Sequence, residues 1–303
     1  MGLKNFIINL APTALVQVFA NPYVAGDSID KAISAAKGFW DERKVCSTID
    51  LLGEEIENDE EVDYTVGVYT RLIDALGEQE FATISLKPTQ LGSHRSTEHC
   101  RNVIEGIVAH AEKYGTKVTL DMEDHPLTDM TLEIFRNIKK DHPTFGTVLQ
   151  SRLFRTDDDI KSLAGLDARI RHCIGIYNEP KDIAMQHKPE MKKKLLEQVE
   201  VLFKEGHYPE IATHDKAALD EAINIAERLN MKKDQYEVQM LMGVPMGDYQ
   251  DQLVKDGITV RLYVPFAEKW VYATAYAKRR LAANPAMAIY ITKNLLQKIT
   301  GKR

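Results

Sequence analysis

The chain has 303 residues, and its composition and charge already exclude several classes of protein. Hydrophobic residues make up 44% and charged residues 28%, which is ordinary for a globular protein and excludes a disordered chain, a collagen-like repeat and a coiled-coil rod. The 39 Lys and Arg residues against 45 Asp and Glu residues give a formal net charge of -6. Because binding to phosphate backbones needs a basic face, this balance argues against nucleic acid as the main partner.

The cysteines and the apolar segments indicate the compartment. Cys46, Cys100 and Cys173 are too few and too widely spaced for a disulfide framework or a zinc site, which fits a reducing environment. No apolar run of 18 or more residues predicts a transmembrane helix. The start of the chain, FIINLAPTALVQVFA, faintly resembles a secretion signal. Since polar residues and a proline interrupt it, we interpret it as an arm that packs on the fold.

Eight β-rich apolar segments recur along the chain. They cover residues 46–53, 81–87, 117–123, 145–151, 170–177, 208–214, 236–242 and 258–266. Most are nearly continuously hydrophobic, as expected of strands that are buried on both faces of a parallel sheet. Segments with helical spacing follow them at 61–79, 97–115, 128–141, 157–166, 188–206, 216–230, 247–257 and 268–283.

A strand followed by a helix, eight times over, predicts an α/β protein of the (β/α)8 TIM-barrel type. A doubly wound sheet is the alternative, but it usually has fewer strands and a glycine-rich first turn, and the chain contains no GxGxxG motif. We therefore predict an N-terminal helical arm over residues 1–45, followed by one barrel over residues 46–303 that binds both substrate and cofactor.

In such barrels the site lies at the C-terminal ends of the strands, so polar residues there are candidates. They are Asp50, Lys87, Asp121, Glu123, Gln150, Arg152, Tyr177, Glu179, Thr213, His214, Asp215, Gln239 and Tyr263. Lys87 stands out because a buried lysine is rare unless it is paired. A structural hydrogen bond explains Asp50 at least as well as catalysis does. Residues 213–215 offer too few ligands for a metal, and we expect none.

The last predicted helix carries the sharpest local feature. Tyr276 shares a helical face with Arg279 and Arg280, because the spacing between them is three and four residues. Two guanidinium groups suit bidentate capture of a carboxylate or phosphate. On the residues alone, anion binding and simple solvation explain the pair equally well. The residues favour a metal-free barrel enzyme with a small anionic substrate, and they do not name the reaction.

The same segments resemble proline dehydrogenase, a flavin-dependent barrel enzyme that oxidises L-proline. The matching motifs follow in order: NPYVAG (21–26), TIDLLGE (48–54), SLKPTQLG (85–92), LDMED (120–124), VLQSRLFRT (148–156), GIYNEP (175–180), IATHD (211–215), YEVQMLMGV (236–244), RLYVPF (261–266) and YAKRRLAANP (276–285). Any one of them alone would be a weak signal, but ten in order are a strong one. The resemblance is closest to the short monofunctional bacterial form.

The resemblance implies a reaction and its partners. L-proline would be oxidised to Δ1-pyrroline-5-carboxylate by hydride transfer to N5 of FAD. The electrons would pass to a membrane quinone, and a separate pyrroline-5-carboxylate dehydrogenase would consume the product. The expected location is the cytoplasm, with peripheral contact at the inner membrane.

The resemblance also implies roles for individual residues. The proline carboxylate would be bound by Lys87, Arg279 and Arg280, and Asp121 would orient this cationic group, so these four are the expected catalytic residues. The pyrrolidine ring would be enclosed by Leu241, Tyr263 and Tyr276. The flavin would be held by Gln150, Arg171, Cys173, Gly175, Ile176, Thr213, His214, Asp215, Gln239 and Leu241, with Arg171 near N5.

Three positions depart from the family pattern. Ala283 stands where a glutamate is usual, Ile174 replaces a lysine, and His172 is unusual at its position in RHCIGIY. We expect an intact carboxylate clamp and an altered flavin environment.

Several alternatives remain open on the sequence. One is a paralogous flavoenzyme for another cyclic amino acid, such as hydroxyproline. Another is a degenerate, non-catalytic family member, although the retained polar residues argue against erosion of the site. A nicotinamide-linked enzyme is disfavoured because the dinucleotide fingerprint is absent. A flavin barrel that reduces a folate is a remote option.

Overall fold

The computed structural model describes residues 22–269, 271–274 and 276. Tyr276 is therefore described. Arg279, Arg280 and Ala283 lie outside the described residues, as does the apolar start of the predicted arm.

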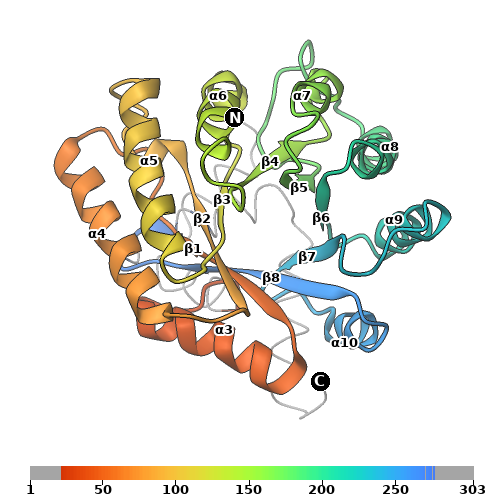
Figure 1. Cartoon of the computed structure of the whole chain (residues 1–303), viewed down its shortest axis with the longest axis horizontal. Coiled ribbons are helices and arrows are strands. Elements are labelled where there is room, and N and C mark those ends of the chain that lie inside the picture. The colour runs from red at the N-terminus through yellow and green to blue at the C-terminus, as the bar shows by residue number, and fades with distance from the viewer. Residues whose placement is uncertain (1–21, 270, 275, 277–303) are drawn as a thin grey trace, which may run out of the picture.

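Eight parallel strands form a closed barrel in chain order, with β1 pairing to β8 (Figure 1). The strands are β1 (Cys46–Leu51), β2 (Ala82–Leu86), β3 (Val118–Leu120), β4 (Gly146–Gln150), β5 (Arg169–Cys173), β6 (Tyr208–Ala212), β7 (Glu237–Leu241) and β8 (Thr259–Phe266). This closed order confirms the predicted (β/α)8 barrel and excludes a doubly wound sheet.

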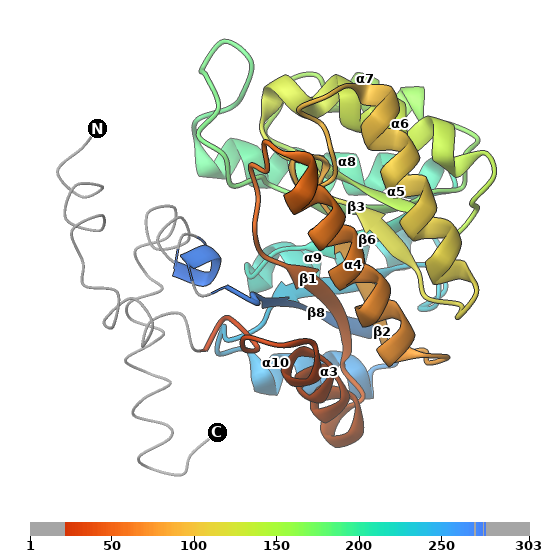
Figure 2. The same cartoon turned by 90° about the vertical axis from the view of Figure 1, so that its left-hand side faces the viewer.

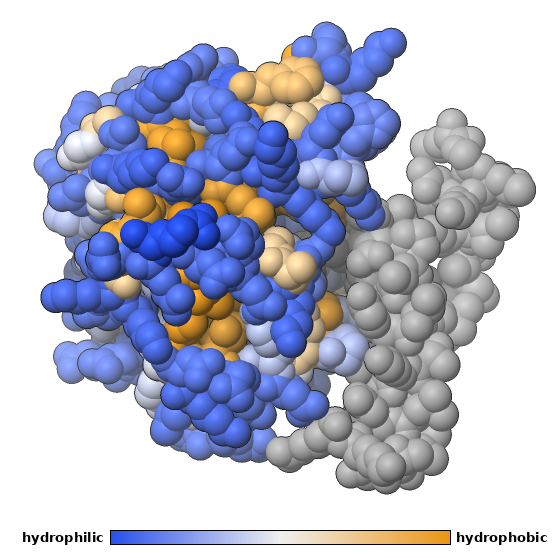
Figure 3. All heavy atoms as spheres, turned by 90° about the vertical axis from the view of Figure 1, so that its right-hand side faces the viewer, coloured by the Kyte–Doolittle hydropathy of each residue, from blue (hydrophilic) through white to orange (hydrophobic). Residues whose placement is uncertain are grey.

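The helices surround the barrel on its outside (Figure 1). They are α3 (Ile29–Arg43), α4 (Asp59–Leu76), α5 (Thr97–Glu112), α6 (Thr128–Lys139), α7 (Thr156–Ser162), α8 (Lys188–Lys204), α9 (Lys216–Arg228) and α10 (Gly247–Lys255), with two short 3-10 helices, η1 (Pro88–Gln90) and η2 (His125–Leu127). Among the described residues, no helix is both long and apolar enough to cross a membrane. The face in Figure 3 is mostly hydrophilic, with smaller hydrophobic areas visible between the hydrophilic residues.

Several helices begin at residues that cap them. The side chains of Ser28, Asn58, Ser96 and Asp215 each accept a hydrogen bond from a backbone N–H in the first turn of the helix that follows. Such caps satisfy donors that have no partner within the helix and typically stabilise it by about 1 kcal/mol.

Helix α3, from the predicted arm, packs between α4 and α10 beside β1 and β8 (Figures 1 and 2). Ala32 and Ala36 are fully buried there, and Arg43 forms an ion pair of 2.7 Å with Asp251 of α10. The sequence predicts that residues 268–283 form the eighth helix of the ring. Residues 271–274 and 276 are indeed helical, but their turn lies at the C-terminal end of the barrel (Figure 2). The place in the ring beside β8 is occupied by α3.

The apolar core lies between the sheet and the helices, whereas the barrel interior is polar. Residues such as Ile49, Ile84 and Val260 are fully buried and belong to the two hydrophobic clusters. Their neighbours along the strands point to the opposite face, because side chains alternate in a strand. On that inner face Thr48 and Thr83 share a hydrogen bond of 3.0 Å. The inner face can therefore hold charged groups that pair with one another.

Gly243 follows β7 in a backbone conformation that glycine favours, with φ of +85°. An added Cβ would lie 2.1 Å from the carbonyl oxygen of Pro22, at the start of the described chain. Gly243→Ala should therefore lower the free energy of unfolding by more than about 1 kcal/mol, measured by urea denaturation. Gly106→Ala is the matched control: Gly106 lies inside α5 with no atom near its Cβ position. It should leave stability unchanged or raise it by up to about 1 kcal/mol. Equal stability of Gly243→Ala and the wild type would contradict this packing.

Candidate active site

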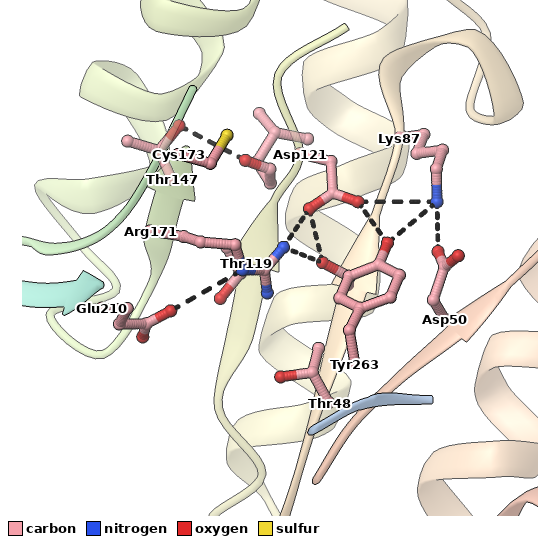
Figure 4. Close-up of polar contacts among 12 residues, drawn as sticks. Thr48, Asp50, Lys87, Thr119, Asp121, Thr147, Arg171, Cys173, Glu210 and Tyr263 are labelled. Atoms are coloured by element: carbon pink, nitrogen blue, oxygen red, sulfur yellow. Dashed lines mark hydrogen bonds and ion pairs between the residues drawn. The ribbon is translucent and has the colours of Figure 1, made fainter. Parts of the chain in front are cut away.

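Asp121 follows the C-terminal end of β3 and lies at the centre of a buried polar cluster (Figure 4). Its Oδ1 accepts hydrogen bonds of 2.6 Å from both Arg171 and the hydroxyl of Ser85. Its Oδ2 accepts a hydrogen bond of 2.6 Å from the hydroxyl of Tyr263 and lies 3.5 Å from Nζ of Lys87. Since β3 is not paired with β5 or β8, these contacts cross the barrel interior.

Lys87 lies between two carboxylates. Its Nζ forms an ion pair with Asp50 of β1, faces Asp121 and donates a hydrogen bond of 3.3 Å to the hydroxyl of Tyr263. Lys87 is only 6% exposed and Asp50 only 1%. We call Asp50, Ser85, Lys87, Asp121, Arg171 and Tyr263 the charge cluster.

The electrostatics of the charge cluster follow from burial and pairing. Burial disfavours the charged form of Lys87, but Asp50, Tyr263 and Asp121 outweigh it and hold the lysine pKa well above its ordinary value. Burial likewise opposes ionisation of Asp121, but Arg171, Lys87 and the hydrogen bonds bring the pKa of this carboxyl below its usual range. Burial dominates at Asp50 and raises its pKa to about 6.

The cluster continues along the barrel interior through Arg171. The Nε of Arg171 donates to Oε1 of Gln239 at 2.7 Å, and the amide nitrogen of Gln239 donates to Glu210 and Glu237 at 2.7 and 2.6 Å. Arg169 then pairs with Glu210, and Arg261 with Glu237, each at 2.6 Å. These interior charges balance: the cations Lys87, Arg169, Arg171 and Arg261 face the anions Asp50, Asp121, Glu210 and Glu237.

Several buried polar atoms in or near the charge cluster have no hydrogen-bond partner among the described residues. They include Oδ2 of Asp50, and also the second terminal nitrogen of Arg171 and Oε1 of Gln150. Beside Gln150, Gly175, with φ of +99°, has no room for a side chain, because a Cβ would lie 2.1 Å from Oε1 of Gln150. A cationic donor, an acceptor and half-buried backbone suit a flat heteroaromatic group that carries carbonyl and N–H groups, as a flavin ring does.

The predicted residues 213–215 lie between β6 and α9 and are half-buried. His214 accepts a hydrogen bond of 2.8 Å at Nε2 from the backbone N–H of Leu241, at the end of β7. Asp215 caps α9 and pairs with Lys192. These contacts fix the loop at the N-terminus of α9, a position that favours anionic groups.

The remaining residues that the resemblance assigns to the site differ in their exposure to solvent. Tyr276 is buried at 6% exposure, Ile176 is 37% exposed, and Leu241 and Cys173 are half-buried. Both polar ends of Gln239 are already engaged by protein groups.

Two of the noted candidates, Glu179 and Arg152, have structural contacts. Glu179 accepts hydrogen bonds from the backbone and ring of His125, and Arg152 donates to the carbonyl oxygen of Tyr177. Burial lowers the pKa of His172 to about 4, so its ring is neutral near pH 7.

Several members of the interior network were missed by sequence reasoning. Ser85, Glu210, Glu237 and Arg261 were not proposed as site residues, and Arg171 was proposed only through the family resemblance. A signal was present, since Arg169 and Arg171 in β5 and Arg261 and Tyr263 in β8 alternate with apolar residues. In a closed barrel this alternation marks the inner face rather than solvent.

Glu123 lies just beyond β3 and is 4% exposed. It accepts hydrogen bonds from the backbone N–H of Thr89 at 2.9 Å and from the Thr89 hydroxyl at 2.6 Å, which fixes η1 directly after Lys87. Burial outweighs these bonds and raises the pKa of Glu123 to about 7 from its usual 4.5.

Glu123→Gln tests this shift through stability. The folded protein keeps the Glu123 proton up to about pH 7, whereas the unfolded chain releases it near pH 4.5. Between these pH values the unfolded state binds fewer protons, so the contribution of Glu123 lowers the free energy of unfolding as the pH rises. The Glu123→Gln variant has no carboxyl group at this position and so lacks this pH-dependent fall in stability. Its stability relative to wild type should therefore be greater at pH 8 than at pH 5 by about 2 kcal/mol in urea denaturation. Asp124→Asn is the control, since the Asp124 side chain does not cap η2. A pH-independent difference for Glu123→Gln would contradict the shift.

Comparison with known proteins gives consistent family matches. The family model described as "Proline dehydrogenase" matches residues 33–176 and 186–292. Proline dehydrogenase 1 of Bacillus subtilis subsp. natto is 31% identical over 280 residues, which cover 92% of this chain and 91% of that protein. Proline dehydrogenase of Deinococcus radiodurans is 33% identical over 284 residues, covering 92% and 90%.

A solved structure gives the same fold. Proline utilization A (PutA) from Bdellovibrio bacteriovorus, inactivated by N-propargylglycine, matches with a TM-score of 0.79 at 23% identity. The match covers 87% of this chain but only 32% of the PutA chain, so this chain spans about a third of that protein. With the family model and the two relatives, the conclusion is direct: the chain belongs to the proline dehydrogenase family, the oxidoreductases of proline catabolism.

Proposed function

We propose that this proline dehydrogenase oxidises L-proline to Δ1-pyrroline-5-carboxylate with FAD as the hydride acceptor. The observation that carries the proposal is the arrangement at the C-terminal end of the barrel. There the charge cluster lies beside buried polar atoms of Gln150 and Arg171 that have no hydrogen-bond partner within the part of the chain that the structure describes. One side of this arrangement suits a charged substrate and the other suits a flavin ring.

The residues present fit FAD. Gln150, Arg171 and the backbone at Gly175 would hold the ring, with Cys173, Ile176, Gln239 and Leu241 around it. Thr213, His214 and Asp215 would lie by the pyrophosphate, since the N-terminus of α9 favours an anion. When bound, the flavin supplies the acceptor for a hydride and its electron pair. The guanidinium of Arg171 would remain a charged donor beside the ring, because the carboxylates of Asp121 and Glu210 stabilise its charge and fix its orientation.

The substrate site follows from the charges. Among the described residues, Lys87 and Arg171 are already balanced by Asp50 and Asp121. The carboxylate of L-proline therefore needs further positive charge, and we assign that to Arg279 and Arg280, with Lys87 as a third contact. Such charge-assisted pairs hold a carboxylate in one orientation.

The remaining protein groups exclude water and fix orientation. Tyr263 is held by Asp121, and Tyr276 is buried, so that with Leu241 they would enclose the apolar ring of the substrate. Hydride transfer depends mainly on holding the donor carbon at the acceptor, so this positioning is the main catalytic contribution of the chain. We assign no residue as the acceptor of the amine proton.

Partners outside the barrel would complete the reaction. A membrane quinone would reoxidise the flavin, and a separate pyrroline-5-carboxylate dehydrogenase would take the product. The protein would be cytoplasmic, with peripheral contact at the inner membrane. Phe154, on the loop after β4, supports such contact, because its apolar side chain is 54% exposed.

A flavin spectrum tests cofactor, substrate and reaction together. The purified protein, supplemented with FAD and freed from excess, should show bound flavin absorbance. Anaerobic titration with L-proline should bleach it, because the flavin accepts the hydride. Hydroxyproline should bleach it more slowly at equal concentration. Protein that binds no FAD, or bound flavin that L-proline leaves oxidised, would contradict the proposal; faster bleaching by hydroxyproline would favour the paralogous activity.

A further inference from the structure

Lys87 is a cation in a place where a lysine would ordinarily lose its proton. Its side chain is 8% exposed, and burial of this degree disfavours an ammonium group strongly. An unpaired lysine in such a position deprotonates in the neutral to alkaline range. What keeps Lys87 charged must therefore be a neighbouring anion.

Two carboxylates face Lys87, and they are not equivalent. Asp121 is 3.5 Å from Nζ and is already bound by Arg171, Ser85 and Tyr263. Asp50 forms the closer ion pair, its Oδ1 is bound by Lys87, and its Oδ2 has no hydrogen-bond partner among the described residues. The charge of Asp50 is thus directed to Lys87, while that of Asp121 is shared.

The backbone gives this pairing a fixed geometry. In the strand register Asp50 stands beside Ser85, two residues before Lys87. Both partners sit at the C-terminal ends of neighbouring strands, where the proposed substrate carboxylate would bind. The Nζ of Lys87 is therefore held at the mouth of the barrel by Asp50. An ammonium group has three donors, and hydrogen bonds to Asp50 and Tyr263 use two of them, so the third can reach a substrate carboxylate without displacing Asp50.

We propose that Asp50 is a positioning residue, which keeps Lys87 protonated and directed at the substrate carboxylate when the pH rises. The inference rests on the proposed role of Lys87 in binding that carboxylate. Asp50 itself touches neither substrate nor cofactor in this account.

The direction in which the pKa of Lys87 changes depends on all the titratable groups that face it. Among the described residues they are Asp50 of β1, Glu54 after β1, Tyr69 of α4, Asp121 and Glu123 after β3, Arg171 of β5, Tyr177 after β5 and Tyr263 of β8. Removing the charge of Asp50 leaves Asp121 as the nearest anion, and Arg171 shares it. The pKa of Lys87 then falls, so its charge is lost on the alkaline side. On the acid side Lys87 is protonated in either case, so no effect is expected there.

The test compares Asp50→Asn with wild type as FAD-loaded enzymes. The KM for L-proline is measured from pH 6.5 to pH 9.5, and the ratio of variant to wild type removes the titration of proline itself. That ratio should rise at least tenfold across the range, while the ratio of kcat values changes little. Asp124→Asn should give a flat ratio. If Asp50→Asn does not fold, Asp50→Ser removes the same charge.

A rescue separates charge from structure. Lys87→Arg with Asp50→Asn, compared with Lys87→Arg alone, should give a pH-independent KM ratio, because a guanidinium keeps its proton throughout this range. A merely structural role for Asp50 would affect both backgrounds alike. A flat KM ratio for Asp50→Asn in the lysine background would overturn the inference.

The Lys87→Met variant separates the role proposed for Asp50 from the role proposed for Lys87 in binding the substrate. If it raises the KM but the Asp50→Asn ratio stays flat with pH, the role of Asp50 is wrong and the proposed function stands. If Lys87→Met leaves the KM unchanged, the proposed role of Lys87 fails and the inference falls with it.

Discussion

The ion pair between Asp121 and Arg171 is the interaction on which the rest of the interior depends. A charge taken into a protein interior is strongly unfavourable unless a counter-charge and hydrogen bonds replace the water that it loses. Arg171 reaches from β5 to Asp121 after β3, across a strand that lies between them. In this arrangement Lys87 and Tyr263 contact Asp121, and Gln239 contacts Arg171. The remaining cations and anions form ion pairs further along the barrel.

This constraint explains why the barrel can be polar inside and still be stable. The hydrophobic stabilisation comes from the outer face of the sheet and the helices around it, where residues such as Ile49, Leu72 and Phe135 are fully buried. The inner face is free to carry charged groups because they balance one another. The strands of a closed barrel support these side chains, and such support suits the positioning that the proposed hydride transfer requires.

The sequence predicts the barrel well because strand and helix segments alternate regularly along the chain, and all eight strands were found within a few residues of their ends. The sequence does not predict which helix occupies the place in the ring beside β8, because that depends on how the chain is arranged in space. Nothing local distinguishes the eighth helix of a ring from α3, which precedes the first strand and occupies that place. The third strand is only Val118–Leu120, shorter than the predicted 117–123, since Asp121 and Glu123 turn to side-chain contacts beyond the paired segment.

The candidate site was predictable in part for the same reason. Lys87 and Asp121 follow the ends of their strands, where barrel sites lie, and the Nζ of Lys87 is 3.5 Å from Oδ2 of Asp121. Glu210, Glu237 and Arg261 sit deeper in their strands, and only closure of the barrel brings them together. Arg279 and Arg280, which lie outside the described residues, keep the roles that the resemblance implies, as part of the proposal.

The most direct measurement of the central claim is a double-mutant cycle between Asp121→Asn and Arg171→Gln. Unfolding in urea gives the free energy for wild type, each single variant and the pair. If the buried ion pair organises the interior, each single change leaves an uncompensated charge and should be destabilising by about 3 kcal/mol. The pair should then recover at least about 1.5 kcal/mol relative to the sum. Strictly additive effects of the two changes would contradict the account.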